Sequence, residues 1–319
     1  NVLLAGHLAQ LAPGRSLWDA EETDPAFVAG AQGFGWLDDL AALGTPAARR
    51  QAQAWTWDWI ARHGAGKGPG WTPDLTGRRI IRWLHHAPML LTARDRAQAE
   101  VFYRALSRQS AYLARRWKAA APGLPRFEAL TGLVYAGISL IGMGRLIGPA
   151  SAALAAACEA DIDREGGIPS RNPEELLEVL TLLTWSASAL TESAHPVPGP
   201  MSSAIRRIAP ALRTLRHADG QLARFHGGGA GAEGRLDQAL AAAGVRPGPP
   251  SPIAMGYARL VGRRTTVIVD ASSPPGGRAV RTAHASTAAF ELTSGRRPVV
   301  VSCGSGAEFG PAWRQAARA

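Results

Sequence analysis

Between positions 34 and 217 the apolar residues recur at helical spacing, and glycine or proline interrupts the pattern at intervals. Trp55 and Trp59, for example, are four residues apart and therefore share one face of a helix. The pattern predicts a succession of helices with short connections. Their expected ranges are 46–63, 75–91, 94–120, 124–142, 145–161, 173–190 and 201–215.

The start of the helix expected at 173–190 carries a recognisable signal. Pro173 suits the first turn, where its missing N–H group costs nothing, and Asn172 is a suitable N-cap. Helices that follow one another without intervening strands form arrays of antiparallel hairpins rather than α/β sheets. No fixed-period repeat accompanies them, so we do not expect a regular solenoid.

The pattern changes after residue 220. A strand-like run at 222–226 leads to three glycines and a last helix near 235–243, and the linker at 247–250 (Pro-Gly-Pro-Pro) is the expected domain boundary. We therefore expect a helical domain at 1–246 and a β domain at 251–319. The β-type runs lie at 254–261, 265–270, 287–292 and 298–303, with a hairpin turn at Ser294-Gly295. These strands are too few to close a sandwich, so the β domain is expected to be incomplete at its C-terminal end.

Composition narrows the class of protein. A chain of 319 residues that is 46% hydrophobic can bury a substantial core in more than one domain. Its formal net charge of +10 favours an anionic partner. The arginines are spread along the sequence, so a dedicated nucleic-acid module is not expected. The apolar stretch 133–157 is interrupted by Arg145 and Pro149, which favours buried helices over a membrane span.

Several chemistries lack their sequence signals. Cys158 and Cys303 form no disulfide framework and do not have the spacing of metal ligands. Neither a Gly-x-Ser-x-Gly elbow nor a His-Glu-x-x-His helix is present. We therefore expect no serine hydrolase, no zinc protease and no cofactor.

The first candidate site lies on the helix expected at 75–91. Arg79, Arg82, Trp83 and His86 recur at i, i+3, i+4 and i+7 and share a face. A Trp face packs on the C–H bonds of a sugar while Arg forks to a carboxylate, so the four residues are candidates for substrate binding. The alternative is a buried Trp in a packing seam with arginines whose stems cover apolar surface. The sequence alone favours this alternative.

Four further residues are candidates for binding or proton transfer. Arg171 and Asn172 stand where a helix N-terminus offers donors to an anion, although a capped helix start explains them equally. His226 precedes the glycine run 227–229, which suits either a ligand loop or a simple turn. His284 suits a metal ligand, a proton-transfer group or a structural role.

Several of these stretches together resemble the heparinase II/III-like proteins, especially the α-proteobacterial type. The matching segments are FGWLDDL at 34–40, GRRIIRWL at 77–84, SRNPE at 170–174, RHADG at 216–220, GYARL at 256–260, VDA at 269–271, and HA at 284–285 leading into FEL at 290–292. The resemblance implies an (α/α) toroid of helical hairpins followed by a β-sandwich, of which only the first strands are present. It also implies a polysaccharide lyase that cleaves uronate-containing acidic glycans by β-elimination, in the periplasm or cell envelope.

β-Elimination needs a base, an acid and a group that neutralises the uronate carboxylate. The resemblance implies that the proton is transferred by His226, Tyr257 or His284. It also implies that the carboxylate is bound by Arg171, Asn172 and Arg79. Because one sugar must meet all these groups, we expect Arg79, Trp83, Arg171, Asn172 and His226 to line one cleft, which His284 approaches.

The chain also departs from the family pattern. The family pattern has a His, one residue, and then a second His that binds a structural divalent metal with a later Asp. His284 resembles the second His, but Thr282 stands at the position of the first His and Ser302 at that of the Asp. This departure favours an alternative, namely a catalytically degenerate glycan-binding or cell-envelope assembly protein of the same fold. An acidic polysaccharide is the expected partner in both cases. A helical array that binds nucleic acid is a third interpretation, motivated by net charge alone.

Overall fold

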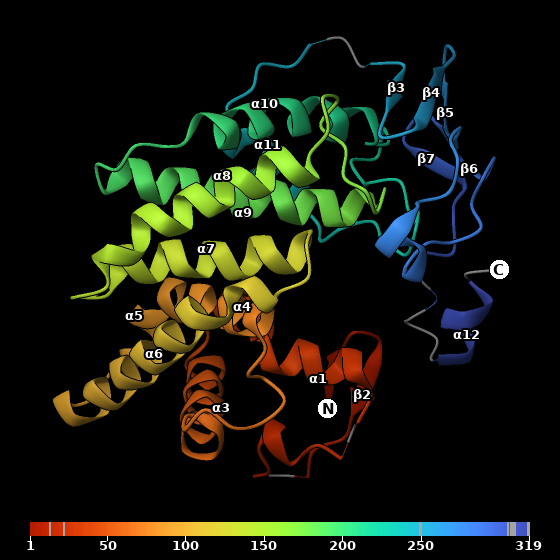
Figure 1. Cartoon of the computed structure of the whole chain (residues 1–319). Coiled ribbons are helices and arrows are strands. Elements are labelled where there is room, and N and C mark those ends of the chain that lie inside the picture. The colour runs from red at the N-terminus through yellow and green to blue at the C-terminus, as the bar shows by residue number, and fades with distance from the viewer. Residues whose placement is uncertain (13, 22, 249–250, 305, 307–310, 318–319) are drawn as a thin grey trace. The chain divides into compact units, whose positions relative to one another are not determined.

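The computed structural model describes the chain except for residues 13, 22, 249–250, 305, 307–310 and 318–319 (Figure 1). The chain divides into two compact units, Asn1–Leu154 and Ala155–Ala319. The first unit is mostly helical, and the second combines helices with a five-stranded antiparallel sheet. The predicted order of helices followed by strands is therefore observed.

The first unit opens with a small hairpin of β1 (Val2–Leu4) and β2 (His7–Ala9). Seven helices of this unit are α1 (Pro25–Gln32), α2 (Trp36–Leu43), α3 (Pro46–His63), α4 (Pro73–His85), α5 (Ala87–Leu91), α6 (Arg96–Arg116) and α7 (Leu124–Ser139). The unit boundary falls within α8 (Ile147–Asp161).

Helices α4 and α7 pack backbone against backbone (Figure 1). A Cβ atom added to Gly132 of α7 would lie 2.6 Å from the Cα atom of Gly77 in α4. A Cβ atom on Gly77 would lie 2.3 Å from the carbonyl oxygen of Glu128. Glycine at both positions is therefore what permits this close approach.

An aromatic cluster fills the core of the first unit. Trp59, Trp83, Phe34 and Phe102 have no exposed surface. The ring centroid of Trp83 lies 5.5 Å from those of Phe34 and Trp59 and 5.2 Å from that of Phe102. Large rings at these distances bury extensive apolar area and account for much of the packing energy of the unit.

The second unit contains α9 (Pro173–Glu192), which packs against α10 (Gly199–Thr214) and α11 (Arg235–Ala242) (Figure 1). The sheet follows in chain order, so each strand pairs with the next. Its strands are β3 (Ile253–Ala254), β4 (Tyr257–Val261), β5 (Thr265–Asp270), β6 (Phe290–Ser294) and β7 (Arg297–Val300), and α12 (Pro311–Ala316) comes after them.

Some predicted elements are confirmed and others need correction. The helix predicted at 46–63 is α3, and Asn172 caps α9 as predicted. The helix predicted at 75–91 is divided into α4 and α5 at His86, because Pro88 cannot continue the helix. The strand predicted at 222–226 is wrong, since Leu222 forms only an isolated bridge to Arg216.

The strand predicted at 254–261 is interrupted. Met255 and Gly256 have φ angles of 51° and 79°, so the chain turns there and forms β3 and β4. The strand predicted at 265–270 is confirmed as β5. Within the described residues, no helix has the length and apolar character needed to cross a bilayer.

Candidate functional site

The site residues predicted in the second unit gather around one buried carboxylate. Asp270, at the end of β5, is 1% exposed and contacts side chains from three other segments. Arg171 precedes α9, His226 lies between α10 and α11, and Ser286 precedes β6. We call these four residues the Asp270 network.

Arg171 is held from every side. Its Nε donates to the carbonyl oxygen of Met255 at 3.0 Å. Its Nη1 donates to the carbonyl oxygen of Ser273 at 2.7 Å, and its Nη2 donates to the carbonyl oxygen of Gly256 at 3.3 Å. It also forms a salt bridge and hydrogen bond with Asp270. Its φ of 52° is uncommon for a non-glycine residue and is maintained by these contacts. Arg171 therefore joins α9 to the sheet and has little left to offer a ligand.

The Asp270 carboxylate is stabilised in its charged form. Burial by itself would raise its pKa, but hydrogen bonds from His226, Arg171 and Ser286, together with the charge of Arg171, hold the pKa below its ordinary value. Ser286 donates its hydroxyl to Oδ2 at 2.8 Å. The carboxylate therefore remains an anion inside the unit.

The hydrogen bonds of His226 define its tautomer. Its Nδ1 accepts the backbone N–H of His284 at 3.2 Å, so Nδ1 carries no proton. Its Nε2 lies 3.3 Å from Asp270 Oδ2 and 3.3 Å from Ser286 Oγ, so the ring proton faces Asp270. Because Ser286 and Asp270 meet the same ring nitrogen, the ring cannot relay a proton between them. The ring is 3% exposed, and both nitrogens are occupied.

Tyr257, the first residue of β4, likewise makes its contacts within the protein. Its hydroxyl donates to the carbonyl oxygen of Arg171 at 2.5 Å, and its ring lies under the Arg171 guanidinium at 4.7 Å. Phe225 stacks on it with centroids 4.6 Å apart. The residue has no exposed surface, and burial raises the pKa of the hydroxyl well above its ordinary value despite the opposing charge of Arg171.

Asn172 is the N-cap of α9. Its Oδ1 accepts the N–H groups of Glu174 at 3.0 Å and Glu175 at 3.2 Å, and its Nδ2 donates to the carbonyl oxygen of His226 at 3.3 Å. The glycine loop is tied to the same helix end, since Gly229 donates its N–H to Glu174 Oε2 at 2.7 Å. This capping interpretation was one of the two that the sequence left open for Asn172.

His284 differs from His226 and Tyr257 because its side chain is only half-buried. Its Nε2 lies against Gly227, where an added Cβ atom would be 3.3 Å away. Of the three residues predicted for proton transfer, His284 is thus the one with surface to meet a substrate.

The residues around His284 do not fit a metal. The hydroxyl of Thr282 donates to Ala279 O at 3.3 Å, and the backbone N–H of Ser302 donates to Glu291 Oε1 at 2.8 Å. Glu291 in turn pairs with His217 at 2.7 Å. Among the described residues no group of three or more His, Cys, Asp or Glu side chains could hold a metal ion. No step of the chemistry is assigned to a metal.

The candidates on α4 belong to the first unit. Arg79 and Trp83 have no exposed surface. The Arg79 guanidinium donates to Gln109 Oε1 at 2.6 Å and to the carbonyl oxygens of Gln32 at 2.9 Å and Gly70 at 3.1 Å. Burial lowers its pKa to about 9. Arg79 and Trp83 therefore have a packing role here, which was the alternative interpretation of their spacing.

Arg82 and His86 meet one carboxylate of α2. His86 Nε2 lies 2.8 Å from Asp38 Oδ1, and Arg82 Nε lies 3.3 Å from Asp38 Oδ2. The expectation of a single cleft lined by α4 and by Arg171, Asn172 and His226 stays a prediction.

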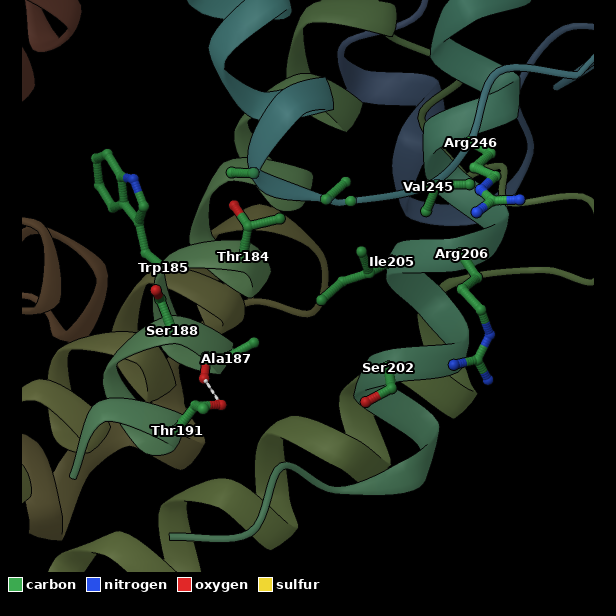
Figure 2. Close-up of a pocket in the computed structure, with 13 residues that line it drawn as sticks. Thr184, Trp185, Ala187, Ser188, Thr191, Ser202, Ile205, Arg206, Val245 and Arg246 are labelled. Carbon is green, nitrogen blue, oxygen red and sulfur yellow. Dashed lines mark hydrogen bonds between the residues drawn. The ribbon is translucent and has the colours of Figure 1, made fainter. Parts of the chain in front are cut away.

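Two pockets of the second unit add residues that the sequence did not single out. One, of about 480 Å³, opens beside Arg171, and four of its lining residues are acidic: Glu159, Asp161, Asp163 and Glu165. A larger one, of about 730 Å³, lies between α9, α10 and residues 242–246 (Figure 2). Figure 2 shows Ile205 facing α9 across this pocket, whereas the guanidinium of Arg206 extends away from α9. None of the predicted site residues lines the larger pocket.

Comparisons with known proteins identify relatives. Residues 246–319 match the family model described as heparinase II/III-like, C-terminal. FtsZ-localized protein C of Caulobacter vibrioides (strain NA1000 / CB15N) is 32% identical over 292 residues, which cover 90% of this chain and 50% of the relative. The chain thus spans half the length of that curated relative.

Solved structures give the fold. The crystal structure of heparinase III matches with a TM-score of 0.69 and 12% identity, over 92% of this chain and 53% of that one. Heparan sulfate lyase HepC from Pedobacter heparinus matches with a TM-score of 0.57 and 16% identity, over 93% of this chain and 53% of that one. The predicted fold class, helical hairpins followed by the strands of a β-sandwich, is thereby confirmed. Residues 246–319 therefore match the heparinase II/III-like C-terminal family, and the chain as a whole has the fold of the solved heparinases.

Proposed function

We propose that this chain is part of a protein that binds acidic glycans on a polysaccharide-lyase-like fold without cleaving them. The observation that carries the proposal is that the polar atoms of Tyr257 and His226 are already hydrogen-bonded within the protein. The hydroxyl of Tyr257 is hydrogen-bonded to Arg171 O at 2.5 Å, and both nitrogens of His226 are occupied.

β-Elimination requires a base that meets the sugar proton and an acid that meets the leaving oxygen. A hydroxyl without exposed surface, whose pKa burial raises, does not become a base at neutral pH. A neutral imidazole that accepts a backbone N–H and faces a buried carboxylate has no lone pair for substrate. Both residues therefore support the interface between α9 and the sheet instead of a reaction.

The charges beside Arg171 support the same proposal. The pocket that opens there has four acidic lining residues, which repel a uronate carboxylate. Arg171 itself is already paired with Asp270. Neither condition favours neutralisation of a substrate carboxylate at this position.

The test is a screen of the full-length protein against heparin, heparan sulfate, chondroitin, alginate and bacterial uronate polymers. We expect saturable binding in calorimetry without the ultraviolet absorbance of a new C4–C5 double bond, and an authentic lyase serves as positive control. Absorbance that grows with time would overturn the proposal.

A lyase is the second candidate, and the half-buried His284 favours it. If His284 transfers the proton, His284→Ala abolishes product formation while glycan binding persists. Thr287→Ala, at an exposed neighbouring position outside the Asp270 network, is the matched control and leaves the rate unchanged.

A role in cell-envelope assembly accompanies the first proposal, because the curated relative is named for its localisation with FtsZ. A fluorescent fusion of the full-length protein is expected to coincide with FtsZ along the cell. A uniform distribution in dividing cells would count against this part of the proposal.

A further inference from the structure

A cluster of cationic side chains lies in the first unit, along the C-terminal half of α6. A pocket of about 450 Å³ opens there between α6 and the loop that joins α3 to α4. Arg108, Arg115 and Arg116 line it together with Trp71 and Tyr112. We call it the α6 pocket.

The arginines of the α6 pocket follow from the spacing of the helix. Arg108 and Arg115 are seven residues apart and share a face, and Arg116 is adjacent. The segment 101–127 contains six basic residues and no Asp or Glu. The arginines are thus locally concentrated here, although they are spread along the chain as a whole.

The charge of the pocket is not compensated by the protein. All three arginines are exposed, and none forms a salt bridge with a residue that the structure describes. Arg96 on the same helix, by contrast, pairs with Glu100 at 3.2 Å. Guanidinium groups without carboxylate partners are available to bind an anion.

The aromatic wall of the pocket is fixed in place. The hydroxyl of Tyr112 donates to the carbonyl oxygen of Trp71, and Trp71 Nε1 donates to His63 O at 2.8 Å. The rings of Tyr112 and Trp71 meet edge to face, with centroids 5.1 Å apart. This arrangement gives a ligand a preorganised apolar surface.

A fourth positive charge lies behind this wall. The Arg79 guanidinium is 5.8 Å from the centroid of Trp71 and 4.1 Å from that of Trp59. Its hydrogen-bond partners are neutral, namely Gln109, Gln32, Gly70 and Thr76. A buried cation without a carboxylate contact among the described residues raises the positive potential at the pocket.

We propose that the α6 pocket binds an anionic sugar unit that carries sulfate or carboxylate. Arginine forks match both groups, the aromatic wall packs on the C–H bonds of a sugar ring, and the volume lies within the range of small-ligand sites. That the ligand is an anion follows from the pocket itself. That it is a sugar rests on the proposed function.

The test is calorimetric titration of the full-length protein with a sulfated uronate disaccharide, a neutral disaccharide and inorganic sulfate. We expect saturable binding of the sulfated disaccharide, no binding of the neutral one, and weaker binding of inorganic sulfate. The double variant Arg108→Gln/Arg115→Gln is expected to weaken disaccharide binding by about tenfold or more. Its thermal unfolding midpoint stays unchanged because both side chains are exposed.

Arg104→Gln is the matched control. Arg104 is an exposed arginine one turn before Arg108 on α6, and it does not line the pocket. Binding that falls equally in the control and the double variant would mean nonspecific attraction and would overturn the inference. Binding of a single-stranded oligonucleotide but not of the disaccharide would also overturn it, in favour of a nucleic-acid surface.

These outcomes separate the inference from the proposed function. If polymer cleavage is observed while the double variant still loses disaccharide binding, the proposed function is wrong and the pocket assignment stands. If no cleavage is observed and the double variant binds the disaccharide normally, the pocket assignment is wrong and the proposed function stands.

Discussion

The salt bridge between Arg171 and Asp270 offers the sharpest test of the structural role assigned to the Asp270 network. Asp270→Asn keeps the size of the side chain and removes its charge. The Arg171 cation then remains buried, with carbonyl oxygens but no anion around it. Removing one partner of a buried pair costs about 3–5 kcal/mol of unfolding free energy.

A double-mutant cycle isolates this interaction from other effects. Arg171→Gln leaves the Asp270 carboxylate buried without its cation, and the double variant removes both charges. We expect the double variant to be less destabilised than the sum of the single variants by about 2 kcal/mol or more. Ser286→Ala, which removes one neutral donor to the same carboxylate, is expected to cost only about 1 kcal/mol.

Urea-induced unfolding followed by circular dichroism measures these free energies. Additive effects of Asp270→Asn and Arg171→Gln would refute the reasoning, because independent losses mean that the two charges do not depend on each other. Equal losses for Asp270→Asn and Ser286→Ala would refute it as well, since the charge would then contribute nothing.

Three further predictions concern packing, titration and the buried hydroxyl. Gly132→Ala is expected to cost about 1–3 kcal/mol of stability, because its Cβ atom would lie 2.6 Å from Gly77 Cα. Gly148→Ala, the control, has nothing within 4 Å of its Cβ atom and is expected to be neutral or stabilising. Chemical denaturation measures the free energy of unfolding of both variants. Burial raises the pKa of Glu128 to about 7 against the opposing charge of Arg78, so its contribution to stability is complete below its unfolded pKa near 4.5 and is lost as the pH rises through 7. A Glu128→Gln variant should therefore lose this pH dependence in thermal unfolding, and an unchanged profile would contradict the assignment. Tyr257→Phe is expected to lower stability by about 1 kcal/mol, because it removes the hydrogen bond from the hydroxyl to Arg171 O. Glycan binding is expected to stay unchanged, and weaker binding in calorimetry would argue for a direct role of the hydroxyl.

Local chemistry in the sequence determined many of the elements. Helix α3 has its predicted bounds because Pro46 starts the helix and the apolar period continues to His63. Asn172 and Pro173 identified the start of α9, since a cap and a first-turn proline act within a few residues. The alternation in β5 was similarly readable, and the segments GYARL at 256–260 and VDA at 269–271 lie within residues 246–319, which match the heparinase II/III-like C-terminal family.

The tertiary structure decided what the candidate site residues do. Arg171 and Asp270 are separated by 99 positions, and nothing in the local pattern indicates that they form a pair. The spacing of Arg79 and Trp83 defines a helix face but does not say whether that face meets solvent or the core, and the structure buries both residues. The three arginines of the α6 pocket form no salt bridge with a residue that the structure describes, because no acidic residue of that part of the chain is folded against them. Helical and strand periods record which residues share a face, whereas burial and charge pairing depend on which distant segments pack together, and that is settled only when the chain folds.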